Sequence, residues 1–205
     1  DGVSDELTIS DVTALTLFQA SLPPPSIKEP ESEVSKSYAL RGEQIFNEIG
    51  CAVCHKPFLE LNSPIYSEPN QFNPPGTLTN YSISDVYQIN LFEGANSNTV
   101  LRTDRGTYLV YAYTDLKRHD MGQLLANEQV EQRFVESPVW LTRRLWGMIS
   151  EPPFLHHGRA TLLDEAIILH GGEADSARAN YENLAQDDKD SIIEFLRTFQ
   201  TDVKQ

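Results

Sequence analysis

The sequence predicts a mainly α-helical protein with long irregular loops and one or two short β-hairpins. Three observations lead to this fold class. Apolar residues recur at helical spacing near the N-terminus, shortly before residue 50 and close to the C-terminus. The stretches between these segments are rich in proline and asparagine, which favours irregular loops. Aromatic and β-branched residues gather near the middle of the chain, which favours short strands.

The first 35 residues differ in character from the rest of the chain. Residues 1–22 predict a loop followed by a helix, with Asp11 as a candidate N-terminal cap. A run of three prolines that begins at Pro23 ends this helix, and the polar sequence after it predicts an extended linker. We therefore expect two parts, an N-terminal helix with a proline-rich linker (residues 1–35) and the main domain (residues 36–205).

Two helices are predicted at the ends of the main domain. Residues 37–49 and residues 187–199 both place apolar side chains at helical spacing. Gly42 lies inside the first of these helices, where a glycine costs about 1 kcal/mol relative to alanine. A close crossing by the last helix would explain the glycine, and the alternative is that it is merely tolerated.

Residues 56–115, in the middle of the chain, show no helical pattern. Residues 56–80 contain several prolines and asparagines, so we expect an irregular loop. Residues 81–115 are rich in tyrosine and valine, and Gly94, Asn96 and Gly106 are turn signals, which together predict one or two short hairpins.

The most specific motif is Cys51-Ala52-Val53-Cys54-His55. Two cysteines at this spacing followed at once by histidine are typical of covalent c-type haem attachment. Each thiol adds to one vinyl group of the haem as a thioether, and the adjoining histidine is placed to bind the iron. We therefore expect one covalent haem c, with Cys51 and Cys54 as anchors and His55 as an axial ligand.

Other uses of this motif explain it less well. A structural zinc site needs four ligands, and the chain has only two cysteines. A thioredoxin-like redox pair would open a helix directly after a strand, whereas helix is predicted before Cys51. A simple disulfide would leave His55 unexplained.

The predicted helices 37–49 and 187–199 would cross beside the haem. This arrangement predicts a cytochrome c-like core.

Charge and hydropathy indicate the surroundings of the protein. The formal net charge is −14, so we expect no nucleic-acid partner and instead a redox protein with a basic docking surface. No apolar run is long enough for a transmembrane segment. Haem c is attached outside the cytoplasm, so we expect a periplasmic or extracellular protein. Because the chain starts at Asp1, we expect that a signal peptide has been removed.

A second haem ligand has several candidates. The segment from Asp115 to Gly122 contains His119 and Met121, and both imidazole and thioether bind haem iron. A buried methionine is also a common gap filler in a core, so residue type does not decide between these roles.

A longer pattern identifies a family. The segments His119-Asp-Met-Gly122, Trp140 to Met148, Glu151 to Thr161 and Leu162 to Glu173, together with the C-x-x-C-H motif, resemble the C-terminal haem domain of the bacterial di-haem cytochrome c peroxidase superfamily. The resemblance is to its di-haem oxidoreductase branch, often called thiol oxidoreductase-like, and covers residues 5–199.

The resemblance implies further site residues. In the superfamily, the residue after a short helix supplies the sixth iron ligand, and the matching position here is His170. Thr161 is expected to cap that helix with Asp164, and two glycines after His170 to end it. A six-coordinate haem held by His55 and His170 is therefore expected, with Met121 as the rival sixth ligand.

The resemblance also implies contacts around the haem. Trp146 is expected to pack on the ring edge, and His156 or Arg159 to contact a propionate or order water. Glu151 and Pro153 match positions that help to hold a calcium ion in some peroxidases. That ion needs oxygen ligands from another domain.

The function expected from this pattern is electron transfer. With both axial positions filled by protein, peroxide has no place to bind on the iron. Full-length relatives carry two haems, whereas this chain has one C-x-x-C-H motif, so a second haem-bearing chain or domain is an expected partner. The alternatives are part of a di-haem peroxidase or oxidoreductase in which His170 leaves the iron, and one haem-bearing subunit of a larger conducting assembly.

Overall fold

The structure is a computed structural model that describes residues 7, 9–22, 24, 27–71, 86–93, 99–127, 134–150 and 152–199. The chain forms two compact units. The first unit contains Asp1–Pro24 and Glu60–Leu109, and the second contains Pro25–Leu59 and Val110–Gln205. These units are groups of mutual contacts, so they do not test whether the predicted parts, residues 1–35 and 36–205, fold independently.

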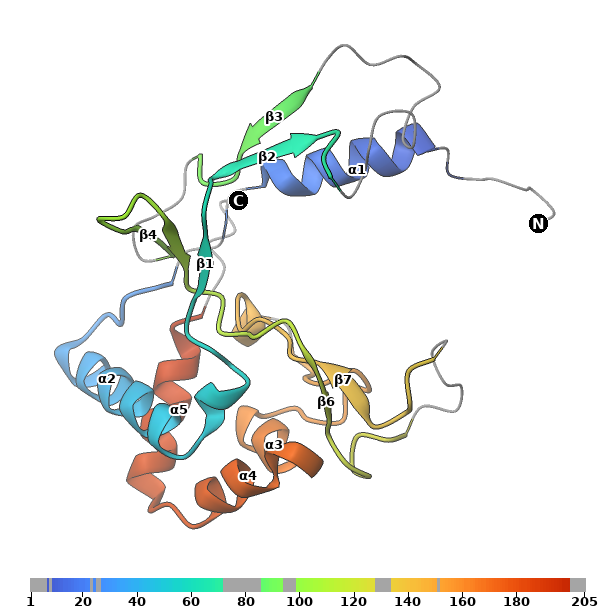
Figure 1. The fold of residues 1–205 in the computed structure, drawn as a ribbon. Helices are drawn as coiled ribbons and strands as arrows, with labels where there is room; N and C mark the ends of the chain where they lie inside the picture. The colour runs from blue at the N-terminus through green and yellow to red at the C-terminus, as the bar shows by residue number, and fades with distance from the viewer. Residues whose placement is uncertain are drawn as a thin grey trace. The chain divides into compact units, whose positions relative to one another are not determined.

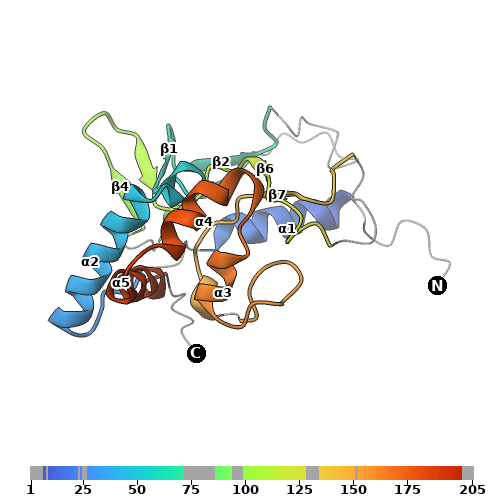
Figure 2. The same ribbon diagram turned by 90° about the horizontal axis from the view of Figure 1, so that it is seen from below.

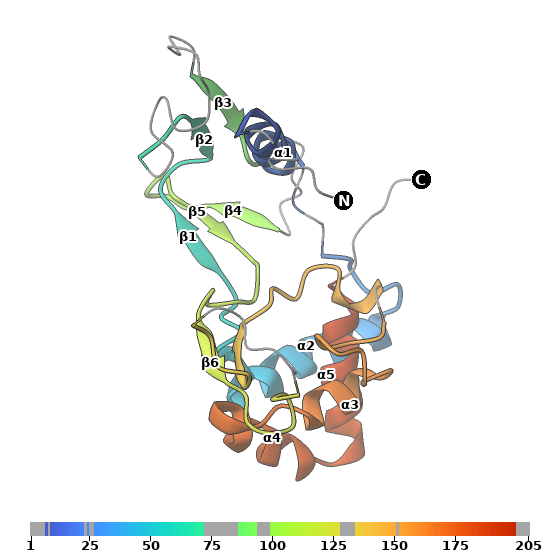
Figure 3. The same ribbon diagram turned by 90° about the vertical axis from the view of Figure 1, so that its right-hand side faces the viewer.

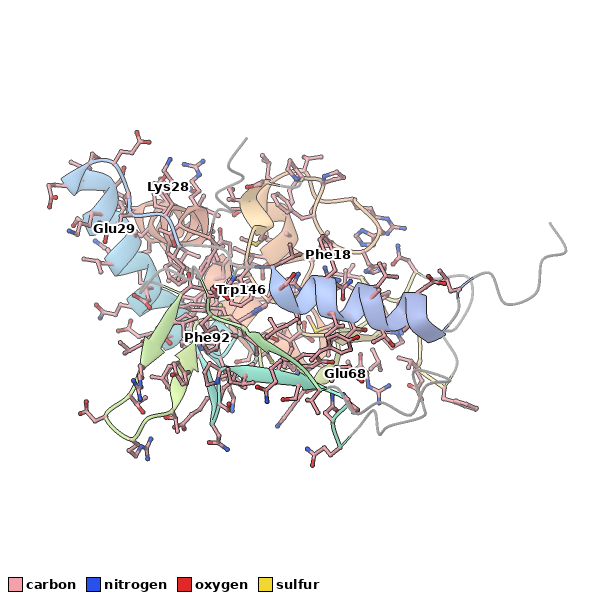
Figure 4. The ribbon with its side chains drawn as sticks, turned by 90° about the horizontal axis from the view of Figure 1, so that it is seen from above. Phe18, Lys28, Glu29, Glu68, Phe92 and Trp146 are labelled. Atoms are coloured by element: carbon pink, nitrogen blue, oxygen red, sulfur yellow. The ribbon has the colours of Figure 1, made fainter. Side chains whose placement is uncertain are left out.

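The first unit combines one helix with short strands (Figure 1). The elements are α1 (Ile9–Ser21), β1 (Leu59–Leu61), β2 (Ile65–Glu68), β3 (Tyr87–Asn90), β4 (Val100–Arg102) and β5 (Tyr108–Val110). Strands β2 and β3 pair antiparallel, with Tyr66 opposite Ile89. The other sheet has the order β1-β5-β4 (Figure 3). Next to it, the ring of Phe92 (labelled in Figure 4) lies 5.3 Å from that of Tyr108.

The second unit is built on helices. Its elements are α2 (Glu33–Glu48), the 3-10 helix η1 (Cys51–Val53), β6 (Arg118–Asp120), β7 (Val139–Leu141), η2 (Met148–Ser150), α3 (Leu163–Ile168), η3 (Gly172–Ala174), α4 (Asp175–Glu182) and α5 (Gln186–Arg197). Strands β6 and β7 pair antiparallel, with His119 opposite Trp140. The two long helices α2 and α5 lie side by side (Figures 1 and 2).

The predicted close crossing at Gly42 is confirmed. A Cβ atom at this position would collide with the carbonyl oxygen of Ser191 and lie 2.8 Å from Cβ of Phe195, both on α5. The glycine therefore lets the two helix backbones touch. Ser32 begins α2 by accepting a hydrogen bond from the backbone N–H of Ser35 at 3.0 Å, which is a side-chain N-cap.

The core of the second unit is aromatic where α2 meets α5. The Phe46 ring centroid lies 5.4 Å from that of Phe195, and the Tyr113 centroid lies 4.6 Å from that of Phe199, both edge-on. Edge-to-face pairs of this kind contribute about 0.5–1.5 kcal/mol beyond the burial of their area. The core is completed by buried apolar residues of α2, α3, α4, α5 and the connecting loops: Ile45, Leu145, Leu163, Tyr181, Ile192 and Leu196.

The prediction of a mainly α-helical fold is wrong. Within the described residues, seven short strands form three sheets beside the five α-helices, so the fold is mixed α and β. Two of these strands, β1 and β2, lie in residues 56–80, for which an irregular loop was expected. Strands of three or four residues are too short to show a period-2 pattern, and their pairing depends on segments far apart in the sequence.

The hairpin predicted around Gly106 is present. Strands β4 and β5 are joined by a turn in which the backbone N–H of Thr103 donates to the carbonyl of Thr107 at 2.8 Å. Gly106 has φ of +82°, which glycine adopts readily. The other turn signals, Gly94 and Asn96, lie outside the described residues. Within the part of the chain that the structure describes, no helix is long and apolar enough to span a membrane.

Candidate haem site

The C-x-x-C-H motif follows directly on the end of α2. Gly50 turns the chain with φ of +104°, a conformation that suits glycine, and η1 then carries Cys51 into a tight helical turn. The backbone N–H of His55 donates to the carbonyl of Cys51 at 3.0 Å. This turn brings Cys51, Cys54 and His55 together locally, as covalent attachment of one haem requires.

The thiols lack the features of a redox pair. Neither cysteine forms a disulfide. Burial raises the pKa of the Cys51 thiol to about 11, and burial together with the Asp115 and Glu173 carboxylates raises that of Cys54. A reactive thiol has a lowered pKa instead. The motif also follows a helix rather than a strand, and the described residues contain no group of three or more His, Cys, Asp or Glu side chains that could hold a metal ion.

His55 is held by a backbone carbonyl. Its Nδ1 lies 3.0 Å from the carbonyl oxygen of Tyr113, so Nδ1 carries the proton and donates. Burial lowers the pKa of His55 to about 4, although the bond to Tyr113 acts in the opposite direction. The ring is therefore neutral near pH 7, and its Nε2 keeps a lone pair for a metal. Hydrogen bonding at one ring nitrogen commonly orients a ligating histidine in this way.

Tyr113 is itself fixed at both ends. Its backbone has a left-handed φ of +50°, which is uncommon for a residue other than glycine, and its carbonyl faces His55. Its hydroxyl donates to Glu43 on α2 at 2.8 Å, and its ring packs edge-on against Phe46 and Phe195. Burial and the Glu43 carboxylate raise the pKa of the Tyr113 hydroxyl, which keeps it protonated as a donor.

The short helix α3 precedes His170, as the sequence predicts, but its cap differs. The carboxylate of Glu165 accepts hydrogen bonds from the backbone N–H and hydroxyl of Thr161, at 2.7 and 3.0 Å, and from the N–H of Leu162 at 3.1 Å. The expected partner Asp164 instead accepts from the hydroxyl of Tyr181 at 2.7 Å. The N-cap of α3 is Leu162 rather than Thr161. The residue three positions after the N-cap, which reaches back to it, is therefore Glu165 and not Asp164.

His170 folds back on its own helix. Its Nδ1 lies 2.7 Å from the carbonyl oxygen of Ala166, one of the last carbonyls of α3, which the helix itself leaves without a partner. Burial lowers the pKa of His170, and the bond to Ala166 opposes that shift. His170 is therefore also a neutral imidazole with Nδ1 as donor and Nε2 as acceptor.

The rings of the two histidines are neighbours. The ring centroids of His55 and His170 are 6.5 Å apart, with the ring planes tilted by 53°. His55 follows η1 and His170 follows α3. The two residues are more than a hundred positions apart in the sequence. Two neutral imidazoles at this separation can bind one metal ion from opposite sides.

The other two candidate ligands lie on β6 and just after it. Both ring nitrogens of His119 face carboxylates, Nε2 at 2.9 Å from Asp115 and Nδ1 at 2.8 Å from Glu173, so neither is available to iron in this conformation. The backbone of Met121 lies against Gly171, where a Cβ atom would be 2.9 Å from the Met121 carbonyl oxygen. The backbone of Met121 therefore lies beside the residue that directly follows His170.

Trp146 is linked through Tyr111 to Phe58, which lies shortly after the C-x-x-C-H motif. Its indole N–H donates to the carbonyl oxygen of Tyr111 at 2.6 Å (Trp146 is labelled in Figure 4), and the Tyr111 ring packs edge-on against Phe58 at 6.0 Å. Phe58 follows the motif by three residues. The contact of Trp146 with a haem edge stays a prediction.

His156 and Arg159 belong to a second cluster. The His156 ring stacks on Trp140 with centroids 3.7 Å apart, and its Nε2 lies 3.0 Å from the Asn127 side chain. With its amide oriented to satisfy both neighbours, Asn127 also accepts from Arg159 at 2.9 Å. The predicted propionate contacts of these residues stay predictions. Of the calcium candidates, Glu151 lies outside the described residues, and Pro153 packs against Gly158.

Three residues of the site were missed by sequence reasoning. They are Tyr113, which orients His55, and Asp115 and Glu173, which bind His119. The Tyr113 contact is made by a backbone carbonyl, which leaves no trace in the sequence. The glycine pair before Glu173 was a usable signal, since adjacent glycines often mark a close backbone approach.

A family model matches the part of the chain that carries His119 and His170. Residues 98–199, about half of the chain, match the family model described as "Di-haem oxidoreductase, putative peroxidase". This stretch of the chain matches the di-haem oxidoreductase family, which confirms the resemblance over residues 98–199. It includes His170 and the His119 segment, while the C-x-x-C-H motif precedes it. Searches of curated proteins and of solved structures found no match.

Proposed function

We propose that this chain is a c-type cytochrome domain that carries one covalent, six-coordinate haem and transfers electrons. Cys51 and Cys54 would anchor the haem through thioethers, and His55 and His170 would be its axial ligands. When bound, the haem supplies a one-electron couple at its iron. The family assignment supports haem binding, and the geometry of the histidine pair supports this particular arrangement.

The separation of the two imidazoles is the observation that carries the proposal. A metal–nitrogen bond is about 2 Å long and each ring centroid lies about 1 Å behind its nitrogen, so rings on opposite sides of one ion have centroids about 6 Å apart. The observed separation is 6.5 Å. Both rings also have Nδ1 occupied by a backbone carbonyl, which leaves Nε2 as the ligating atom in each case.

Ligation by two protein side chains favours electron transfer over turnover of a small substrate. His55 and His170 together would leave no exchangeable position on the iron. Both rings are partly buried, and this desolvation lowers the pKa of each and keeps them neutral. Two imidazoles also favour a lower potential than one imidazole and one thioether, so we expect a low-potential couple.

Exposure of the motif supports exchange of electrons with a partner protein. Val53, between the two cysteines, is 71% exposed, so the attachment segment reaches the protein surface. With a net charge of −14, the chain would be steered towards a basic docking surface on a redox protein. We place this activity in the periplasm or outside the cell, where c-type haem is attached, and we propose a second haem-bearing chain or domain as a partner.

Electron paramagnetic resonance of the oxidised haem protein, with its near-infrared spectrum, tests the ligand assignment. We expect a bis-histidine low-spin signal without a thioether-to-iron band. The signal should be lost in His170→Ala and kept in Met121→Leu. A thioether band in the wild type that disappears in Met121→Leu would assign the sixth position to Met121 instead. A potential in the strongly positive range of histidine–methionine haems would also contradict the assignment.

The description of the matched family favours a second candidate function, a di-haem peroxidase or oxidoreductase. In that case His170 would leave the iron and open a position for peroxide. Steady-state assay with hydrogen peroxide and a reduced donor distinguishes the two functions. Turnover by the wild-type chain, together with a high-spin resonance signal, would favour the enzyme, whereas electron transfer predicts neither.

A further inference from the structure

His119 links β6 to the turn that follows His170. Its Nδ1 lies 2.8 Å from Oε2 of Glu173, and its Nε2 lies 2.9 Å from Oδ2 of Asp115. The second carboxylate oxygen of Glu173 accepts a hydrogen bond from the backbone N–H of Asp120 at 2.9 Å. We call Asp115, His119 and Glu173 the His119 clasp.

The His119 clasp consists of charge-assisted hydrogen bonds. A carboxylate accepts only, so both ring nitrogens of His119 must donate and the ring is a cation. Such bonds are about twice as strong as those between neutral groups. The side chains of His119 and Asp115 are 16% and 5% exposed, whereas that of Glu173 is 55% exposed, so solvent screens the Asp115 side of the clasp little and the Glu173 side more. Asp115 is also held by the backbone N–H of Lys117 at 2.9 Å.

Backbone contacts lie next to the clasp. A Cβ atom at Gly172 would collide with the carbonyl oxygen of Asp120 and lie 2.7 Å from the N–H nitrogen of Gly122. Gly172 also has φ of +56°. The two residues after His170 therefore touch the chain that leaves β6, and the clasp bonds span this crossing.

The clasp adds an anchor beside His170 to those of its own helix. The bond from its Nδ1 to Ala166 fixes the ring relative to α3, but not α3 relative to His55. Within the six-residue helix, Leu163 and Ala166 are buried and Ile167 packs against the core. The end of the helix, where His170 lies, is next to the clasp.

We propose that His119 is a positioning residue, which holds the turn after His170 against β6 and thereby keeps His170 opposite His55. The inference rests on the proposed ligation by His170. His119 acts through Glu173 and does not touch the haem iron itself. Loss of the clasp would let His170 dissociate from the iron more often, without removing any ligand.

Cyanide binding to the oxidised haem protein measures this dissociation, because cyanide reaches a six-coordinate iron only when the sixth ligand has left. In His119→Gln and in Glu173→Gln we expect cyanide binding at least about tenfold faster than in the wild type, as the loss of a charge-assisted bond allows. The Gln variant at 173 keeps an oxygen for the N–H of Asp120. The double variant should be little faster than His119→Gln alone, since His119→Gln already breaks the bond to Glu173 as well as the bond to Asp115.

Arg197→Gln is the matched control. It breaks an exposed ion pair with Glu194 on α5 in the same unit, and its cyanide rate should stay within about twofold of the wild type. If His119→Gln and Glu173→Gln bind cyanide no faster than Arg197→Gln, the positioning role is wrong. Thermal unfolding of all variants separates this effect from general loss of stability, since a purely structural role would lower the melting temperature without a change in cyanide rate.

His170→Ala separates the two proposals. If this variant keeps the resonance spectrum of the wild type, ligation by His170 is wrong and the proposed function fails. If His170→Ala loses the bis-histidine signal while the clasp variants keep the wild-type cyanide rate, only the role of His119 is overturned. Faster cyanide binding in both clasp variants, with a changed spectrum in His170→Ala, supports both.

Discussion

The carbonyl oxygen of Tyr113 lies 3.0 Å from Nδ1 of His55, although the two residues are 58 positions apart. The contact makes a loop residue responsible for the orientation of the proposed proximal ligand. Because the Tyr113 side chain is tied to α2 through Glu43, the helix, the loop and the imidazole form one connected group.

Removal of the Tyr113 hydroxyl tests this connection. Tyr113→Phe keeps the aromatic packing but loses the 2.8 Å bond to Glu43. We expect the free energy of unfolding to fall by about 1–2 kcal/mol, the usual cost of a lost, partly buried hydrogen bond. Guanidinium unfolding measures it. Tyr108→Phe is the control, in the first unit, and should change stability by less than about 0.5 kcal/mol. An equal loss in both variants would contradict the role of the bond.

Substitution of Gly42 should be costly despite the better helix propensity of alanine. Gly42→Ala gains about 1 kcal/mol in intrinsic propensity, but the new methyl group would collide with Ser191 and Phe195. Overpacking of this kind costs about 1–3 kcal/mol or more, so we expect net destabilisation. The denaturant midpoint measures it, and Lys36→Ala, an exposed position on the same helix, should leave the midpoint nearly unchanged. Unchanged stability in Gly42→Ala would mean that the helices can move apart.

The His119 clasp makes stability depend on pH. Hydrogen bonds to Glu173 and Asp115 raise the pKa of His119 above its unfolded value of about 6.5. The contribution of protonated His119 is therefore fully present below about pH 6.5, and it is lost as pH rises through the folded pKa.

The carboxylates of Glu173 and Asp115 make stability depend on pH in the acid range. The bond to His119 lowers the pKa of Glu173. For Asp115, burial acts to raise the pKa, but bonds from Lys117, His119 and Thr142 outweigh it and lower the pKa. Their contribution is present above about pH 4 and lost as pH falls further.

Unfolding of the wild type and His119→Gln across pH checks this dependence. The stability advantage of the wild type should be largest between about pH 5 and 6.5 and should shrink towards pH 9 and towards pH 3. A difference that stays constant over this range would show that the ring is not charged in the folded protein.

Covalent attachment can be tested apart from ligation. Intact-protein mass spectrometry under denaturing conditions should show the mass of one haem on the wild type and on the single variants Cys51→Ala and Cys54→Ala. Each single variant keeps one thioether. The double variant should release its haem. Complete release from the wild type on denaturation would contradict haem c.

The sequence predicted the two terminal helices and their contact, because glycine at a helical position has few explanations other than a close approach. It also contains the C-x-x-C-H motif, where three chemically active residues within five positions predict covalent haem attachment, which stays a prediction. The fold class failed at the strands. Each has three or four residues, and strands such as β1 and β5 pair over nearly fifty positions, a distance at which local patterns carry no information.

The site divides in the same way. The residue types in the chain determined which side chains can bind iron: His55 beside its cysteines, and His119, Met121 and His170 as candidates for the opposite side. Only the tertiary structure distinguishes the histidines and favours His170 over His119, because both nitrogens of His119 face carboxylates whereas one nitrogen of His170 bonds a backbone carbonyl. The hydrogen bonds that make this choice come from carboxylates and backbone carbonyls that folding alone brings within reach, so a linear sequence cannot express them.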